Sequence, residues 1–162
     1  MTLDGKEKDI LLSWEILPGY EETLERIFVS TIDISPLKEA QTALQEQKRF
    51  LGNVFNSIQD GISVLDTNLN ILRVNASMAK RHAQVAPLIG KKCYVVYRER
   101  SRPCVPCPTL KALNTGEQHT EIVQVPHNKE GEKEPSWIEL RAFPIKSPDG
   151  TVTGVIEYIR DI

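Results

Sequence analysis

Three cysteines are the residues of this chain whose type and spacing can do chemistry. Cys104 and Cys107 are three positions apart in the stretch Arg102-Pro-Cys-Val-Pro-Cys-Pro-Thr109, and Cys93 lies upstream of both. Two cysteines at this spacing can bind one tetrahedral metal ion such as zinc, and Cys93 can supply a third ligand. A complete structural zinc site needs a fourth ligand, and His119 is the candidate for it.

Two other interpretations of the cysteine pair stay open. The pair can cycle between dithiol and disulfide, because Pro108 favours a helix start directly after Cys107 and a helix N-terminus lowers the pKa of a thiol. Alternatively, the stretch is a proline-stiffened loop whose partly buried thiols pack as small apolar groups. A thioredoxin-type oxidoreductase is excluded, because the elements around the pair lack a parallel strand–helix–strand unit.

The composition is that of a soluble globular protein. Of the 162 residues, 40% are apolar and 26% are charged. The net charge of −2 and the scattered basic residues exclude a nucleic-acid-binding surface. No apolar run approaches the roughly 18 residues of a membrane span, and the N-terminus lacks the regions of a signal peptide. Because an odd number of cysteines argues against a secreted disulfide framework, we expect a cytoplasmic protein.

The strands that frame the cysteine-containing segment are part of an internal repeat at the two ends of the chain. Pro18, which ends an apolar run, recurs 126 residues later as Pro144. Asp33-Ile34, which ends the next apolar run, recurs 128 residues later as Asp161-Ile162. The order turn, strand, turn, strand is therefore present twice, with two residues gained in the second turn.

This repeat divides the chain into three parts. We interpret residues 1–35 as the C-terminal strands of a preceding domain that is incomplete here, residues 36–58 as a linker helix, and residues 50–162 as a complete domain. Ser35 is expected to be the N-cap of the helix, and Pro36 suits its first position.

The linker helix carries a narrow apolar stripe. Apolar residues recur at every seventh position, at Leu37, Leu44, Leu51 and Ile58. Such a stripe can be buried against the helix's own domain or against the same helix of a second chain. We favour the second alternative, a homodimer through a parallel coiled coil.

The complete domain has an α+β pattern. A short hairpin is followed by short helices, the first with Asn75 as a typical N-cap, and then by three antiparallel strands. The expected strands are residues 61–66, 71–75, 119–125, 136–145 and 151–159. Alternation along them predicts six side chains that face a ligand pocket: Ile62, Val64, Leu72, Ile138, Leu140 and Ala142.

These elements resemble the PAS domain, the sensor module of bacterial histidine kinases, diguanylate cyclases and related two-component and signalling proteins. The resemblance rests on Phe55-Asn-Ser-Ile-Gln-Asp-Gly-Ile-Ser-Val-Leu-Asp66, Ile71-Leu-Arg-Val-Asn75, Leu88-Ile-Gly90, Cys93-Tyr94 and the closing residues 149–162. It implies a five-stranded antiparallel sheet with short helices over one face and a pocket between them. It also implies that signals pass through flanking helices to a covalently linked output domain outside this chain, a kinase or a cyclase.

The resemblance also bears on cofactors. Flavin-binding members carry Gly-x-Asn-Cys-Arg-Phe-Leu-Gln, whereas this chain has Gly90-Lys-Lys-Cys93-Tyr-Val-Val-Tyr97 and lacks the Asn, Arg and Gln. Haem-binding members have an axial histidine in the helix that corresponds to residues 109–114, which contain none. Neither flavin nor haem is therefore expected, and zinc stays a candidate.

No nucleophile–base pair, phosphate loop or carboxylate dyad is recognisable, so we expect no enzyme activity within these residues. The leading hypothesis is a sensory module that binds a small ligand or a partner. The first alternative is a metal or thiol redox switch at Cys93, Cys104 and Cys107, and the second is a dimerisation module without a ligand.

Overall fold

The computed structural model describes residues 5, 7–19, 22, 26–125 and 136–162. The chain divides into two compact units, residues 1–52 and residues 53–162. Among the described residues, no helix combines the length and the apolar character that crossing a lipid bilayer requires.

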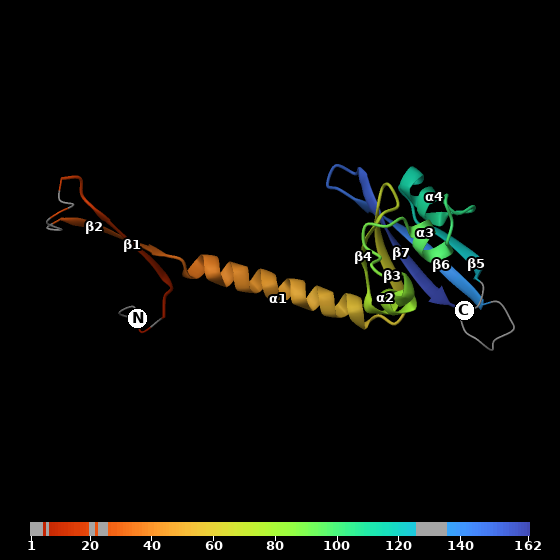
Figure 1. Cartoon of the computed structure of the whole chain (residues 1–162), viewed down its shortest axis with the longest axis horizontal. Coiled ribbons are helices and arrows are strands. Elements are labelled where there is room, and N and C mark those ends of the chain that lie inside the picture. Colours follow the sequence, from red (N-terminus) through yellow and green to blue (C-terminus); the bar gives the residue numbers. More distant parts are fainter. Residues whose placement is uncertain (1–4, 6, 20–21, 23–25, 126–135) are drawn as a thin grey trace. The chain divides into compact units, whose positions relative to one another are not determined.

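The first unit consists of a two-stranded hairpin and most of a long helix (Figure 1). Strand β1 (Ile10–Ile16) pairs antiparallel with β2 (Ile27–Asp33), and α1 (Ser35–Ser57) follows. The prediction that Ser35 is the N-cap was wrong, because Ser35 already belongs to the helix. Its hydroxyl accepts a hydrogen bond from the amide of Asp9 (2.8 Å), and its own amide donates to the carboxylate of Asp33 (3.0 Å).

The predicted apolar stripe lies exposed along α1. Leu37, Leu44 and Leu51 are 59%, 51% and 56% exposed, and no residue of α1 is buried. Ile58, the fourth predicted member, follows the last residue of the helix and therefore does not extend the stripe on it.

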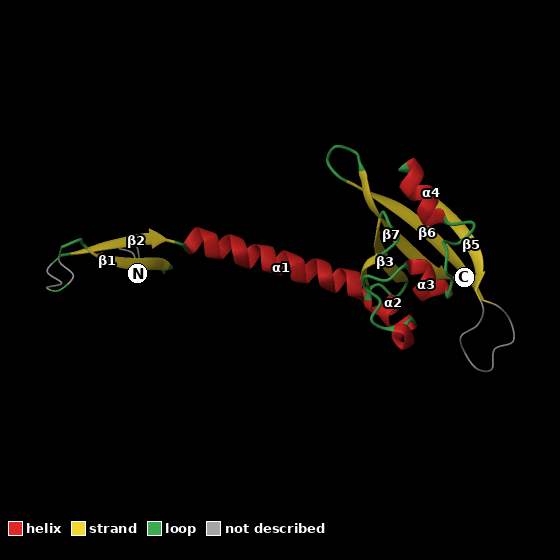
Figure 2. Ribbon diagram, turned by 45° about the horizontal axis from the view of Figure 1, so that its top comes forward, coloured by secondary structure: helices red, strands yellow, loops and turns green. Residues whose placement is uncertain are grey.

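The second unit is an α+β domain, as the sequence predicted. Its five strands form one antiparallel sheet in the order β4-β3-β7-β6-β5, with β7 in the centre (Figure 1). The strands are β3 (Gly61–Asp66), β4 (Ile71–Val74), β5 (His119–Val125), β6 (Ser136–Lys146) and β7 (Val152–Asp161). The short helices lie over one face of the sheet (Figure 2). They are α2 (Ala76–Arg81), the 3-10 helix η1 (Ala83–Val85), α3 (Cys93–Arg98) and α4 (Pro108–Thr115).

The core lies between these helices and the sheet. Met78 of α2 packs against β6 and β7, and Ala112 of α4 does the same at another point of these strands. Val96 of α3 packs with Leu65 and Ile71 of the β3–β4 hairpin. These short helices thus place apolar side chains on the same face of the five-stranded sheet. Burying apolar surface stabilises the domain by about 25 cal/mol for each Å².

The hairpins of the two units share one register. Ile10 pairs with Asp33 in the first, and Ile138 pairs with Asp161 in the second, so both strands are offset by 128 residues. Ile16, two residues before Pro18, has the pairing position of Pro144, so strand pairing gives the first strand an offset of 128, whereas the two prolines are 126 residues apart. The interpretation of residues 1–35 as strands of a preceding domain stays a prediction.

Candidate functional site

A buried carboxyl group lies in the middle of the helix-facing side of the sheet. Glu157 of the central strand β7 is only 4% exposed, between Val155 and Ile159 on the same side. Thr109, in the first turn of α4, donates its hydroxyl hydrogen to this carboxyl. It is the only hydrogen-bond partner of the Glu157 carboxyl among the described residues. Burial raises the pKa of Glu157, against the opposing effects of this hydrogen bond and of Arg98, so the structure favours the neutral acid.

A second polar group lies on the same side of the sheet. The hydroxyls of Ser63 in β3 and Tyr97 in α3 are 2.8 Å apart and share a hydrogen bond. The ring of His82 lies against Tyr97 in a tilted arrangement, with a centroid distance of 4.8 Å and an interplanar angle of 39°. Burial is the main cause that raises the pKa of Tyr97 and lowers the pKa of His82, so both favour their neutral forms. Beneath the helices, burial therefore shifts the pKa values of Glu157, Tyr97 and His82 toward their neutral forms.

The three cysteines lie at the start of α3, in the loop after it and at the start of α4. Glu157 is near enough to Cys93 and Cys107 to affect their pKa values. Cys93 is the first residue of α3, and Cys107 is the N-cap of α4, with its Sγ accepting from the amide of Leu110 (3.5 Å). All three thiols are free. The expected lowering of the Cys107 pKa by the helix N-terminus was wrong: burial raises the pKa of this thiol more than the amide hydrogen bond lowers it. Burial raises the pKa of Cys93 as well, and Glu157 adds to the increase in both.

His119, the predicted fourth metal ligand, lies beyond the other end of α4. Its ring is hydrogen-bonded to Thr115, the last residue of that helix (2.9 Å). Eight residues of α-helix span about 12 Å, so His119 and Cys107 are at opposite ends of that length. In the described part of the chain, no group of three or more His, Cys, Asp or Glu side chains is arranged to hold a metal ion.

The six predicted pocket residues lie on both faces of the sheet. Ile138, Leu140 and Ala142 face the helices, since they pack in the clusters around Met78 and Ala112. The alternation predicted for the first hairpin was out of phase by one residue: Leu65 and Ile71 face the helices instead. The other three predicted residues, Ile62, Val64 and Leu72, therefore belong to the opposite face, where Leu72 is 54% exposed.

Sequence reasoning missed the polar residues of the helix-facing side. A signal for Glu157 was present, because it is the one charged residue among the alternate positions 155, 157 and 159 of an apolar strand. No comparable signal exists for Thr109, Ser63 or Tyr97, since hydroxyl residues are common on both faces of helices and strands.

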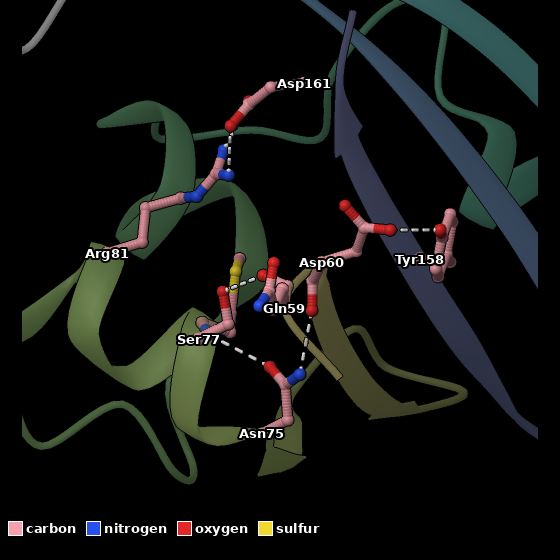
Figure 3. Close-up of polar contacts among 8 residues, drawn as sticks. Gln59, Asp60, Asn75, Ser77, Arg81, Tyr158 and Asp161 are labelled. Atoms are coloured by element: carbon pink, nitrogen blue, oxygen red, sulfur yellow. Dashed lines mark hydrogen bonds and ion pairs between the residues drawn. The ribbon is translucent and has the colours of Figure 1, made fainter. Parts of the chain in front are cut away.

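Asn75 fastens the start of the domain to α2, and its predicted role as N-cap is confirmed. Its Oδ1 accepts from the amides of Ile62 and Met78, both at 3.0 Å. Its Nδ2 donates to the carbonyl of Asp60 (2.8 Å; Figure 3) and to the carbonyl of Ile58 (3.0 Å). The side chain is fully buried.

The end of the domain meets the same helix. Arg81, the last residue of α2, binds the carboxylate of Asp161 at the end of β7 through two hydrogen bonds of 3.0 and 2.7 Å (Figure 3). Ser77 of α2 donates to the carbonyl of Gln59, and Tyr158 of β7 donates to Asp60. The segment that leads into β3 and the end of β7 are therefore connected through one short helix.

The opposite face of the sheet carries a hollow of about 240 Å³, lined by Arg141, Phe143, Tyr158 and Arg160. Arg141 binds Glu139 at 2.8 Å, and its Nε has no hydrogen-bond partner in the described residues. This hollow lies away from Glu157 and the cysteines, because its residues occupy the alternate positions of β6 and β7.

Comparison with known proteins shows which family has this fold. The family model described as PAS fold matches residues 55–162. A search of curated proteins finds no match. Among solved structures, a PAS domain from Colwellia psychrerythraea is 18% identical with a TM-score of 0.55, over 74% of this chain and 97% of that chain. The PAS domain of an HTR-like protein from Haloarcula marismortui is 16% identical with a TM-score of 0.54, over 77% of this chain and 99% of that one.

A third similar structure is the PAS domain of nitrogen regulation protein NR(II) from Vibrio parahaemolyticus. It is 16% identical with a TM-score of 0.52, over 68% of this chain and 96% of that chain. At these identities the structural likeness concerns the fold, and it agrees with the sheet order and the helical layer described above. Through residues 55–162, this chain belongs to the PAS domain family.

Proposed function

We propose that residues 55–162 are a sensory module that binds a small molecule between the sheet and α3–α4 and passes the signal on through its flanking segments. The observation that carries this proposal is the carboxyl of Glu157, which is buried in the central strand with a single hydrogen bond. Buried polar groups normally have their hydrogen-bonding capacity satisfied, so a carboxyl with one partner is a candidate for recognising a ligand.

The chemistry of the site suggests the class of ligand. A neutral carboxyl both donates and accepts hydrogen bonds, and the hydroxyls of Ser63 and Tyr97 can do the same. The apolar residues around them favour a compact molecule with an apolar body and one or two hydroxyl, amide or amine groups. A ligand group that takes the place of the Thr109 hydroxyl on Glu157 would detach the first turn of α4 from β7.

The route for the signal is α2. Met78 packs in the core beside β6 and β7, while Asn75, Ser77 and Arg81 hold the segment before β3 and the end of β7. A shift of the core beneath α2 would move both ends of the domain together. We assign no catalysis to this module and expect its output domain, a kinase or a cyclase of a cytoplasmic signalling protein, to be covalently linked to it.

Thermal melting and native mass spectrometry with a panel of small alcohols, amides and amines test the proposal. A ligand present at 100 times its dissociation constant stabilises the folded state by about 2.7 kcal/mol. We expect such a ligand to raise the melting temperature of the wild-type chain and of Glu117→Gln, an exposed control, but not of Glu157→Leu. No response to the panel, or an equal response of Glu157→Leu, would contradict the proposal and favour a dimerisation module without a ligand.

A homodimer through α1 is a second proposal, which rests on the exposed stripe of that helix. Leu37, Leu44 and Leu51 each expose more than half of their surface, and Phe50 and Val54 beside them are 65% and 45% exposed. The same helix of a second chain would bury these residues along one seam. Sedimentation equilibrium should give a dimer for the wild type and for Gln41→Glu, and a monomer for Leu44→Glu. A wild-type monomer at all concentrations would contradict the dimer.

A further inference from the structure

Two of the three cysteines are accessible from solvent. Cys104, in the loop between α3 and α4, and Cys107, at the end of that loop, are both partly exposed. Cys93 is only 7% exposed. The chain bends at Val105 and Pro106, between the two accessible cysteines. A disulfide needs Cα atoms about 4.4–6.8 Å apart, which two residues three positions apart can reach in a bent loop. An oxidant in solution therefore meets this pair first.

Cys107 is also linked to the buried carboxyl. Its Sγ accepts from the amide of Leu110 at the start of α4, and Thr109, two residues after Cys107, holds Glu157. A change at Cys107 therefore acts on the first turn of α4 and, through one hydrogen bond, on the central strand β7.

We propose that Cys104 and Cys107 form a reversible disulfide on exposure to a peroxide, and that this bond changes how α4 is held against β7. The inference rests on the proposed sensory function and names oxidation as a signal for it. It differs from a ligand signal because it needs no occupant between the sheet and the helices.

The reaction balances with one peroxide molecule for each disulfide. The Cys104 thiolate attacks one oxygen of hydrogen peroxide, the O–O bond breaks, and hydroxide leaves and takes a proton to become water. The resulting sulfenic acid is attacked by the sulfur of Cys107, which loses its proton, and the second hydroxide leaves as water. The two sulfurs give up two electrons, and the peroxide is reduced to two molecules of water.

The surroundings indicate which sulfur reacts first. Burial raises the pKa of Cys107, and its sulfur already accepts a hydrogen bond from Leu110, so Cys107 suits the resolving role. Cys104 lies in the loop between α3 and α4, outside any helix. We therefore expect Cys104 to carry the sulfenic acid and the overall reaction to become faster as pH rises.

The test uses the full chain, reduced and then treated with hydrogen peroxide. We expect thiol titration to fall from three free thiols to one, and the mass of the monomer to fall by two hydrogen atoms. Dithiothreitol should restore both values. Cys93→Ser should still lose the two hydrogens, whereas Cys104→Ser and Cys107→Ser should not. Trapping with dimedone should label Cys104 in the Cys107→Ser variant.

The second readout is hydrogen exchange at the amides of Leu110 and Lys111. We expect oxidation to change the exchange of these amides in the wild type and in Cys93→Ser, and to leave it unchanged in Cys107→Ser. Three thiols that survive peroxide, a bond that requires Cys93, or linkage only between chains would overturn the proposed disulfide. Formation of the bond with unchanged exchange in α4 would overturn its coupling to β7.

These outcomes are separate from those of the ligand experiment. Ligand-dependent melting is measured with all thiols reduced, so a failed ligand panel does not affect the result with peroxide. Conversely, a Cys104→Ser chain that still binds a ligand would retain the proposed sensory function without the redox signal.

Discussion

Thr109 in the first turn of α4 donates its hydroxyl hydrogen to the buried carboxyl of Glu157 in the central strand β7. This contact connects the helical layer to the strand that pairs with both β3 and β6. Because the carboxyl of Glu157 is buried and has no other hydrogen-bond partner in the described residues, the position of α4 and the protonation of this carboxyl depend on each other.

The first prediction concerns the pH dependence of stability. The pKa of Glu157 is raised in the folded state above its ordinary value of 4.5. Below pH 4.5 the carboxyl is neutral in both the folded and the unfolded state, so folding carries no penalty from its charge. As pH rises from that value to the folded pKa, the free energy of unfolding decreases. Glu157→Gln is neutral at every pH and keeps an acceptor for Thr109. Between the two pKa values it should gain stability over the wild type by about 1.4 kcal/mol for each pH unit.

Urea unfolding between pH 4 and pH 8 would measure this difference. Glu117→Gln, at an exposed position, is the matched control and should follow the wild type. If Glu157→Gln and the wild type keep the same difference in stability over the whole pH range, the carboxyl is not held neutral.

The second prediction concerns Asn75. Its fully buried side chain makes hydrogen bonds to Ile58, Asp60, Ile62 and Met78. Asn75→Ala leaves these backbone groups without their partner and should lower the free energy of unfolding by about 2–4 kcal/mol. Asn68→Ala, in the exposed turn after β3, should change it by less than about 0.5 kcal/mol. Equal changes in the free energy of unfolding for the two substitutions, measured by chemical denaturation, would contradict a stabilising role of the Asn75 side chain.

The third prediction concerns the close approach of β3 and β7 at Gly154. A Cβ atom added to it would lie 2.5 Å from the carbonyl oxygen of Leu65 on the neighbouring strand β3. Because the obstacle is backbone, the strands would have to separate, and Gly154→Ala should cost about 1–3 kcal/mol. Thr153→Ala, one residue earlier and exposed, is the control. A Gly154→Ala chain with wild-type stability would mean that β3 and β7 can move apart at no cost.

The fourth prediction separates signalling from stability. The carboxylate of Asp161 is 64% exposed, and its pairing with Arg81 should contribute only about 0.2–1 kcal/mol to unfolding. Arg81→Gln should nevertheless accelerate hydrogen exchange at the end of β7, because the two hydrogen bonds that hold this end to α2 are lost. Lys80→Gln is the neighbouring control. Unchanged exchange at Arg160 and Asp161 in Arg81→Gln would remove α2 from the proposed signal route.

The sequence was informative where a few neighbouring residues decide the structure. Asn75 was predicted as an N-cap, and Pro108 was predicted to start a helix directly after Cys107. The structure agrees at both positions. These features depend on contacts within one helical turn, so the residues themselves carry the information. The order of the five strands along the chain followed from alternation and turns in the same way.

Features that depend on the backbone path between strands were less predictable. The phase of the first hairpin was wrong, and the structure has an irregular register between Val64 and Leu65, opposite Arg73 and Ile71. The extra residue is Leu72 of β4, and one extra residue in a strand reverses the face of every residue beyond it. On β3 the error has another cause, because the small polar residue Ser63 faces the helices and the apolar Ile62 and Val64 face the other way. No residue type in this short segment marks that irregularity.

By itself, the sequence determined the kinds of elements, their order and the spacing of the cysteines, because local backbone preferences and hydrophobic alternation are properties of short segments. Only the tertiary structure decided that Glu157 is buried beneath α4, that the Cys107 thiol is desolvated rather than activated, and that His119 lies at the far end of the same helix. These properties arise from what packs against a side chain from distant parts of the chain, and desolvation there outweighs the local effect of a helix terminus.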